Sequence, residues 1–167
     1  MSYTRYCKCH FYEGESEHWG LLDRKAFAHK GAMPHYTPDI QVSPEHLTLE
    51  VNFDWTKERV WGTTKYDLLF KGHDIDKITF DAINLDISRV LIGRNSVDFE
   101  NTGKKIIIPL KKKFQLGDRM SIKLDHSVTR PVAGIYFTKP DNHHTDRFKT
   151  VWTQGQDEDS RYYFPCF

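Results

Sequence analysis

His46-Leu47-Thr48-Leu49-Glu50-Val51-Asn52-Phe53 alternates apolar and polar side chains residue by residue. Successive side chains of a strand point to opposite faces of a sheet, so this period of two predicts a strand with one wet face. Residues 54–58 have the composition of a turn, and residues 59–70 return with Val60, Gly62, Thr64 and further side chains in the same period. The glycine within the returning strand predicts a bulge or a close approach of another backbone.

Short β-type runs continue through the rest of the chain, separated by turn signals rich in glycine, asparagine and aspartate. No segment carries a helical stripe over eleven or more residues. Regular short strands with this punctuation predict an all-β fold, an antiparallel β-sandwich. The runs are 77–80, 88–92, 97–100, 105–110, 120–125, 133–138 and 150–154.

Residues 1–45 differ in composition from the rest of the chain, because they contain six glycines and prolines and only short apolar runs. We expect them to form an N-terminal extension that wraps the domain, with a strand at residues 6–12. Residues 46–167 are then expected to form the β domain.

Length and composition restrict the class of protein. A chain of 167 residues with 38% hydrophobic residues is long enough for one domain with a core. The formal net charge of +1 argues against nucleic acid as the main partner, since phosphate binding normally leaves a strong basic excess. The sequence shows neither a membrane span nor the apolar region of a signal peptide, so no membrane partner and a cytoplasmic location are expected.

Three groups of residues raise the question of a bound ion. Cys7-Lys8-Cys9-His10 has half of a zinc ligand set, but no second pair follows, so ordinary strand residues are expected there. His143-His144, near two aspartates, has ligand atoms but the composition of a polar loop, which is the favoured interpretation. Lys111-Lys112-Lys113 is expected to be a solvated turn or a protected strand end rather than an anion site. Three cysteines, an odd number, do not make a disulfide framework.

The last fifteen residues combine a polar block with an aromatic end: Thr153-Gln154-Gly155-Gln156-Asp157-Glu158-Asp159-Ser160-Arg161-Tyr162-Tyr163-Phe164-Pro165-Cys166-Phe167. If the strand continued, Gln154 and Gln156 would share one face, and paired amides suit a peptide-like ligand. An end this apolar predicts that the chain is cut within a larger core. The cut would expose Phe164 and Phe167 and would favour self-association.

This stretch resembles the end of the N-terminal domain of the gluzincin zinc aminopeptidases, which include aminopeptidase N and leukotriene hydrolase. The matching residues are Thr153-Gln154, Arg161 and Phe164-Pro165-Cys166-Phe167. Gly134-Ile135-Tyr136-Phe137 is similar to the family's Gly-Leu-Tyr element, and the hairpin that begins at His46 is similar to its opening hairpin. The resemblance covers residues 46–167 and implies a saddle-like, mostly antiparallel β domain.

The resemblance also implies a role in substrate binding. Gln154 and Gln156 would line the pocket for the first side chain of a peptide substrate. Many family members have glutamate at the position of Gln156, where it helps hold the free amino terminus. A neutral amide can accept a hydrogen bond from an ammonium group but cannot pair its charge. The alternative is that both glutamines bind the backbone at a strand end. Glu158 is expected to be solvated, and Arg161 to form a structural pair.

The chain lacks the groups that hydrolysis needs. A zinc peptidase requires His-Glu-x-x-His on a helix, and no histidine here is followed by glutamate in that arrangement. The family's Gly-x-Met-Glu-Asn motif is absent as well. We expect the fragment to be non-catalytic, without tightly bound zinc, and zinc to belong to the catalytic domain of a parent aminopeptidase.

Two other functions remain open. One is a non-catalytic scaffold of the same fold. The other is a stand-alone β-sandwich binding module, with Trp55, Trp61 and Trp152 as a carbohydrate platform, although these tryptophans are better interpreted as core.

Overall fold

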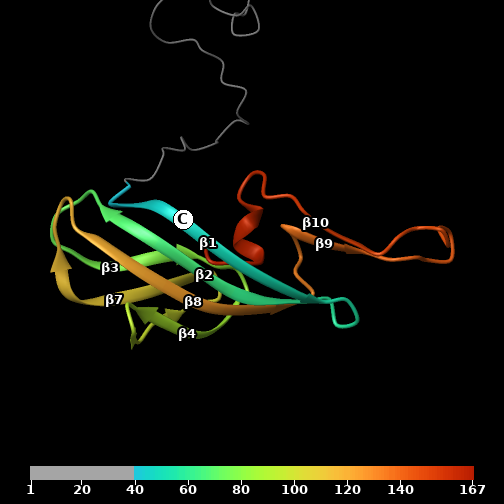
Figure 1. Ribbon diagram of the computed structural model, residues 1–167, viewed down its shortest axis with the longest axis horizontal. Coiled ribbons are helices and arrows are strands. Elements are labelled where there is room, and N and C mark those ends of the chain that lie inside the picture. Colours follow the sequence, from blue (N-terminus) through green and yellow to red (C-terminus); the bar gives the residue numbers. More distant parts are fainter. Residues whose placement is uncertain (1–39) are drawn as a thin grey trace, which may run out of the picture. The chain divides into compact units, whose positions relative to one another are not determined.

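The structure is a computed structural model that describes residues 40–167. These residues form antiparallel sheets, together with one short 3-10 helix, η2 (Asp159–Tyr162) (Figure 1). The prediction of an all-β fold is confirmed. The strands are β1 (Val42–Asp54), β2 (Arg59–Phe70), β3 (Ile75–Asp81), β4 (Asp86–Ile92), β5 (Asn95–Ser96), β6 (Glu100–Asn101), β7 (Lys105–Phe114), β8 (Arg119–Thr129), β9 (Ile135–Thr138) and β10 (Thr150–Thr153).

The largest sheet has the strand order β1-β2-β8-β4-β5. Its opening hairpin is the one predicted from the period of two, with Leu49 opposite Thr64 and Val51 opposite Gly62. A Cβ atom added to Gly62 would lie 1.8 Å from the backbone oxygen of Glu50. The predicted close approach is therefore confirmed at Gly62, whereas the register shift of this hairpin lies between Pro44 and His46.

A second sheet, of order β3-β7-β6, shares one core with the first. The core consists of the side chains that alternate inward along each strand, and Tyr66 from β2 stacks on Phe80 from β3 with their ring centroids 5.3 Å apart. The apolar side of β1 is covered only in part. Leu47 is 40% exposed and Phe53 is 44% exposed, because β1 is the edge strand of its sheet.

The predicted strand at residues 97–100 is wrong in its bounds. Two short strands stand there instead, β5 paired with β4 in the large sheet and β6 paired with β7 in the second sheet. Residues 97–99 cross from one sheet to the other, so they pair with neither along their length. Val97 and Phe99 still pack against the core, which explains their strand-like alternation.

The three lysines 111–113 lie exposed within β7, near its end. The pairing between β3 and β7 shifts register at this place, and the Lys113 Nζ atom lies 3.9 Å from Asp74. Of the two alternatives that the sequence left open, a solvated turn or a strand end, the structure shows the end of a strand, with all three lysines solvated. The predicted strand at residues 6–12 and the group Cys7-Lys8-Cys9-His10 lie outside the described residues. No helix formed by residues 40–167 has the length and apolar character needed to span a lipid bilayer.

Candidate functional site

The last residues of the chain fold back onto the free edge of β3. Asp81 and Cys166 exchange two backbone hydrogen bonds, of 2.7 Å and 3.0 Å, as in an antiparallel pair. The Ile83 N–H donates to the carbonyl oxygen of Arg161 at 2.8 Å. From β2, the Tyr66 hydroxyl donates to the carbonyl oxygen of Pro165 at 2.9 Å. The segment is thus fixed at several points by strands that lie far earlier in the chain.

This docking decides the exposure of the terminal aromatic residues. Phe164 is only 7% exposed, so its predicted exposure is wrong: it is buried when the segment folds back on β3. Phe167 is 47% exposed, as predicted. Its ring nevertheless lies 4.6 Å from that of Phe80 and 5.4 Å from that of Tyr66, so one side of it is packed.

Gln154 and Gln156 lie in an exposed loop between β10 and η2. Since β10 ends at Thr153, the argument that strand alternation places both on one face is wrong. The Gln154 N–H donates to the carbonyl oxygen of Gly134 at 3.0 Å. The Gln154 Oε1 atom accepts from the Gln156 N–H at 3.3 Å. The Gln154 side chain is therefore used in a hydrogen bond to the backbone of the loop. The side-chain amide of Gln156 is exposed and forms no hydrogen bond with any described residue.

Gly134 holds this loop against η2. Its φ angle is +79°, and an added Cβ atom would lie 2.1 Å from the backbone oxygen of Asp159 and 2.9 Å from the Tyr163 ring. Within the loop, the Asp159 N–H donates to the carbonyl oxygen of Gly155 at 3.2 Å. Only glycine allows both the backbone conformation and the close approach. Gly134 positions Gln154 and Gln156, a role that the sequence indicated only through the Gly-Ile-Tyr-Phe match.

Arg161 forms the structural pair that was predicted. Its Nη1 atom lies 2.6 Å from the carboxylate of Glu158, across one turn of η2. The Glu158 side chain is 69% exposed, so it is solvated as well as paired. This ion pair stabilises the turn. The Gln156 amide is then the group of the loop that is free to bind a ligand.

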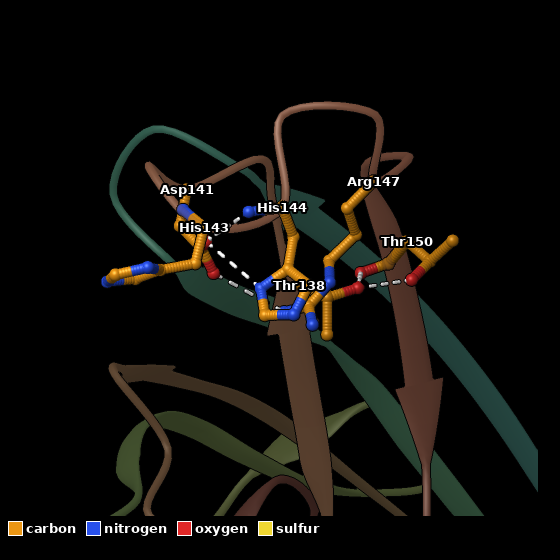
Figure 2. A network of polar contacts seen from close by, with 6 residues as sticks. All are labelled: Thr138, Asp141, His143, His144, Arg147 and Thr150. Carbon is orange, nitrogen blue, oxygen red and sulfur yellow. Dashed lines mark hydrogen bonds and ion pairs between the residues drawn. The ribbon is translucent and has the colours of Figure 1, made fainter.

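The loop between β9 and β10 contains the two adjacent histidines, and it is a loop as predicted. Figure 2 shows that the Asp141 carboxylate organises it. This carboxylate accepts from the backbone N–H groups of His143 and His144 at 2.9 Å and 2.8 Å, and Arg147 lies 3.6 Å away. These hydrogen bonds hold the pKa of Asp141 below its usual value, and the largest contribution comes from the backbone N–H of His143.

At the base of this loop the hydroxyl groups of Thr138 and Thr150 are hydrogen bonded across the hairpin (Figure 2). Within residues 40–167, no three His, Cys, Asp or Glu side chains are close enough to share a metal ion. The described residues therefore do not fit a zinc ion.

The described part of the chain contains no activated nucleophile at the candidate site. Cys166 is the one free cysteine among residues 40–167, and burial raises the pKa of its thiol to about 11. A thiol with so high a pKa stays protonated and unreactive near neutral pH. The chemistry available at the loop is hydrogen bonding by the Gln156 amide, which can accept from an ammonium group or a peptide N–H and donate to a carbonyl.

The interpretation of the three tryptophans as core is wrong for Trp61 and Trp152. Trp61 is 39% exposed and Trp152 is 48% exposed. Trp152 stacks on Tyr136 across the β9–β10 hairpin, with ring centroids 4.4 Å apart. Trp55 is half-buried, and its ring meets that of Phe137 edge-on at 5.8 Å.

Comparison with known structures shows the same fold in a leukotriene A4 hydrolase and in a zinc metallopeptidase. Yeast leukotriene A4 hydrolase in complex with bestatin aligns with a TM-score of 0.65 and 17% identity, over 83% of this chain and 23% of the yeast chain. An M1 zinc metallopeptidase from Deinococcus radiodurans, in a mutant form bound to a Tyr-Ser-Ala substrate, aligns with a TM-score of 0.59 and 13% identity, over 75% of this chain and 29% of the other. This chain thus spans less than a third of the length of either enzyme.

A comparison with curated proteins finds no match. Residues 35–167 match the sequence profile of the family described as the peptidase M1 N-terminal domain. The matched range contains every described strand and the docked terminal segment. The chain belongs to the peptidase M1 N-terminal domain family.

Proposed function

We propose that residues 40–167 are the N-terminal, substrate-cleft-forming domain of a zinc-dependent aminopeptidase, which removes N-terminal residues from peptides. The observation that carries the proposal is the loop of Gln154 and Gln156, exposed yet fixed on both sides. Gly134 holds its start, and the pairing of Cys166 with Asp81 holds the segment beyond it. A fixed loop can position a substrate group without a large loss of conformational entropy on binding.

The two glutamines would contribute differently. The Gln154 side chain is occupied by the backbone of the loop, so it would act by shaping the pocket for the first side chain of the peptide. The Gln156 amide is exposed and would accept a hydrogen bond from the substrate's amino group. Zinc and the general base would come from a catalytic domain, since the described residues hold no metal-ligand group. A cytoplasmic location stays a prediction.

In the longer polypeptide that joins this domain to a zinc domain, Gln156→Glu should favour substrates with a free amino group. The carboxylate adds a charge partner for the ammonium group, which is only partly desolvated. We expect a gain of about 1–2 kcal/mol, or about five- to thirtyfold in kcat/KM. N-acetylated forms of the same peptides have no ammonium group and should gain nothing. The measurement is kcat/KM on matched free and acetylated peptides.

Two control variants accompany this comparison. Asn142→Asp adds the same charge to the exposed β9–β10 loop and should leave the ratio of free to acetylated substrate unchanged. Gln154→Ala should weaken the selection of the first side chain of the peptide, and it should change kcat/KM by the same factor for free and for acetylated peptides. Equal effects of Gln156→Glu on both kinds of peptide would place Gln156 outside the cleft.

A further inference from the structure

The large sheet has a polar hollow on the face turned away from the core. Strand register places the outward side chains of β1, β2, β8 and β4 in cross-strand rows, and Figure 1 shows these strands side by side. The hollow has a volume of about 390 Å³, which falls within the range of about 300–1,000 Å³ usual for small-molecule sites. Two adjacent rows line it, namely Asn52, Trp61 and Ser127, and then Glu50, Thr63, Asp125 and Arg89.

One wall of the hollow is a fixed ionic group. The Arg89 Nη2 and Nε atoms lie 2.6 Å and 2.8 Å from Asp125 Oδ2, and the Thr63 hydroxyl donates to Oδ1 at 2.9 Å. Burial alone would raise the pKa of Asp125, but the hydrogen bonds from Arg89 and Thr63 lower it below its usual value. Asp125 is thus an ionised carboxylate whose orientation is fixed and whose charge is paired with that of Arg89. The Arg89 side chain remains 55% exposed to solvent.

The other wall is aromatic. Trp61 is 39% exposed, and the Arg59 guanidinium lies 5.8 Å from the centroid of its ring while donating to the Ser127 hydroxyl at 3.4 Å. These contacts hold the side chains around the indole in place. The neighbouring side chains of Glu50 and Asn52 are exposed, and within residues 40–167 no side-chain hydrogen bond or ion pair occupies them.

The combination of groups selects the class of ligand. A pyranose ring has an apolar C–H face that packs on an indole, and hydroxyl groups at its edge that both donate and accept hydrogen bonds. A carboxylate, an amide and a guanidinium surround Trp61, which supplies both acceptors and donors. The charged side chains of the lining are nearly balanced, with three cations (Arg59, Arg89 and Lys123) and two carboxylates (Glu50 and Asp125). A nucleic acid phosphate is normally bound where basic side chains are in strong excess, so this balance favours a neutral ligand. We propose that the hollow around Trp61 binds a neutral saccharide of one or two rings.

The proposal is independent of the peptidase function, because no residue of the hollow belongs to the segment 153–167. The test uses the purified chain and a panel of neutral disaccharides: cellobiose, maltose, lactose, mannobiose and diacetylchitobiose. Binding is followed at up to ~10 mM sugar through the NMR signals of the Trp61 indole N–H and of the backbone N–H groups of Thr63 and Ser127, which also line the hollow and remain in a Trp61 variant. At least one sugar should shift these signals saturably. By the backbone signals, Trp61→Ala should weaken its binding about tenfold or more.

Trp152→Ala is the matched control, since Trp152 is also exposed but lies outside the hollow. It should leave the affinity for the sugar unchanged. The proposal is overturned if no sugar of the panel shifts the Trp61 signal, or if both tryptophan variants weaken binding equally. It is also overturned if only a sulfated heparin disaccharide binds, with an affinity that falls steeply with salt, because that result would assign the hollow to anions.

Discussion

Replacing Gly134 by alanine is expected to lower the free energy of unfolding by about 3 kcal/mol. Two costs combine at this position. The φ angle of +79° disfavours any residue with a Cβ atom, and that atom would lie 2.1 Å from the Asp159 oxygen. Since Asp159 belongs to η2, the strain must displace the turn that comes after the two glutamines. Urea denaturation measures the loss, and amide NMR shifts of residues 154–163 locate it.

Gly103→Ala is the matched control for this substitution. Gly103 has the same φ angle of +79°, but an added Cβ atom would meet nothing within 4 Å. This variant should bear only the conformational cost, about 1–2 kcal/mol. If the two variants lose the same stability, the contact between Gly134 and η2 does not hold the loop.

Acidification is expected to destabilise the domain through His126. This side chain is only 4% exposed, its Nε2 atom lies 3.0 Å from the Thr64 hydroxyl, and its buried Nδ1 atom has no partner among the described residues. Burial lowers the pKa of His126 to about 4, although the charge of Asp125 acts in the opposite direction. The fold therefore excludes the proton that the unfolded chain accepts below a pH of about 6.5.

The sign of the effect is set by this order of pKa values. The stabilising contribution of neutral His126 is complete above pH ~6.5 and is lost as the pH falls towards ~4. Between pH 7 and pH 4.5 the loss should be about 2–3 kcal/mol. The measurement is the free energy of unfolding at the two values of pH, for the wild-type chain and for His126→Gln.

The glutamine variant keeps a hydrogen-bonding group beside Thr64 but does not titrate. Carboxylates with lowered pKa, such as Glu45 and Asp125, lose their contribution in both proteins, so the difference between the two proteins isolates His126. Parallel losses of stability in the two proteins would show that His126 is not kept neutral by the fold.

The fold could be predicted from the sequence where the pattern is local. The alternation through residues 46–53 and its return after the turn specified a hairpin whose observed register agrees with it. At residues 97–99 the same alternation arises from packing against the core while the chain changes sheets. Periodicity reports which side chains are buried, and it does not report which backbone supplies the hydrogen bonds.

The exposure of the aromatic residues was harder to predict. Trp61 lies out of phase with Val60, Gly62 and Thr64, and this phase was the available signal that it faces solvent. The burial of Phe164 depends on contacts with β3, more than eighty residues earlier, which no local pattern reports.

The candidate site was located by resemblance, and its geometry was not predicted. The sequence identified Gln154 and Gln156 as a pair, but their relation depends on where β10 ends. Gly155 between them was the signal that the strand does not continue. Their different roles result from one hydrogen bond, between the Gln154 side chain and the backbone N–H of Gln156.

Photo-crosslinking tests most directly whether the loop lines a substrate cleft. The experiment uses a longer polypeptide that contains the proposed zinc domain. Benzoylphenylalanine replaces Gln156 in one variant and, in a control, Arg94, which lies in the exposed turn between β4 and β5. Irradiation with a peptide isotopically labelled at its first residue, followed by mass spectrometry, identifies the crosslinked atoms. The account predicts a crosslink from position 156 to the first residue of the peptide, suppressed by excess unlabelled peptide and absent at position 94. Equal labelling at both positions, or none at position 156, would contradict it.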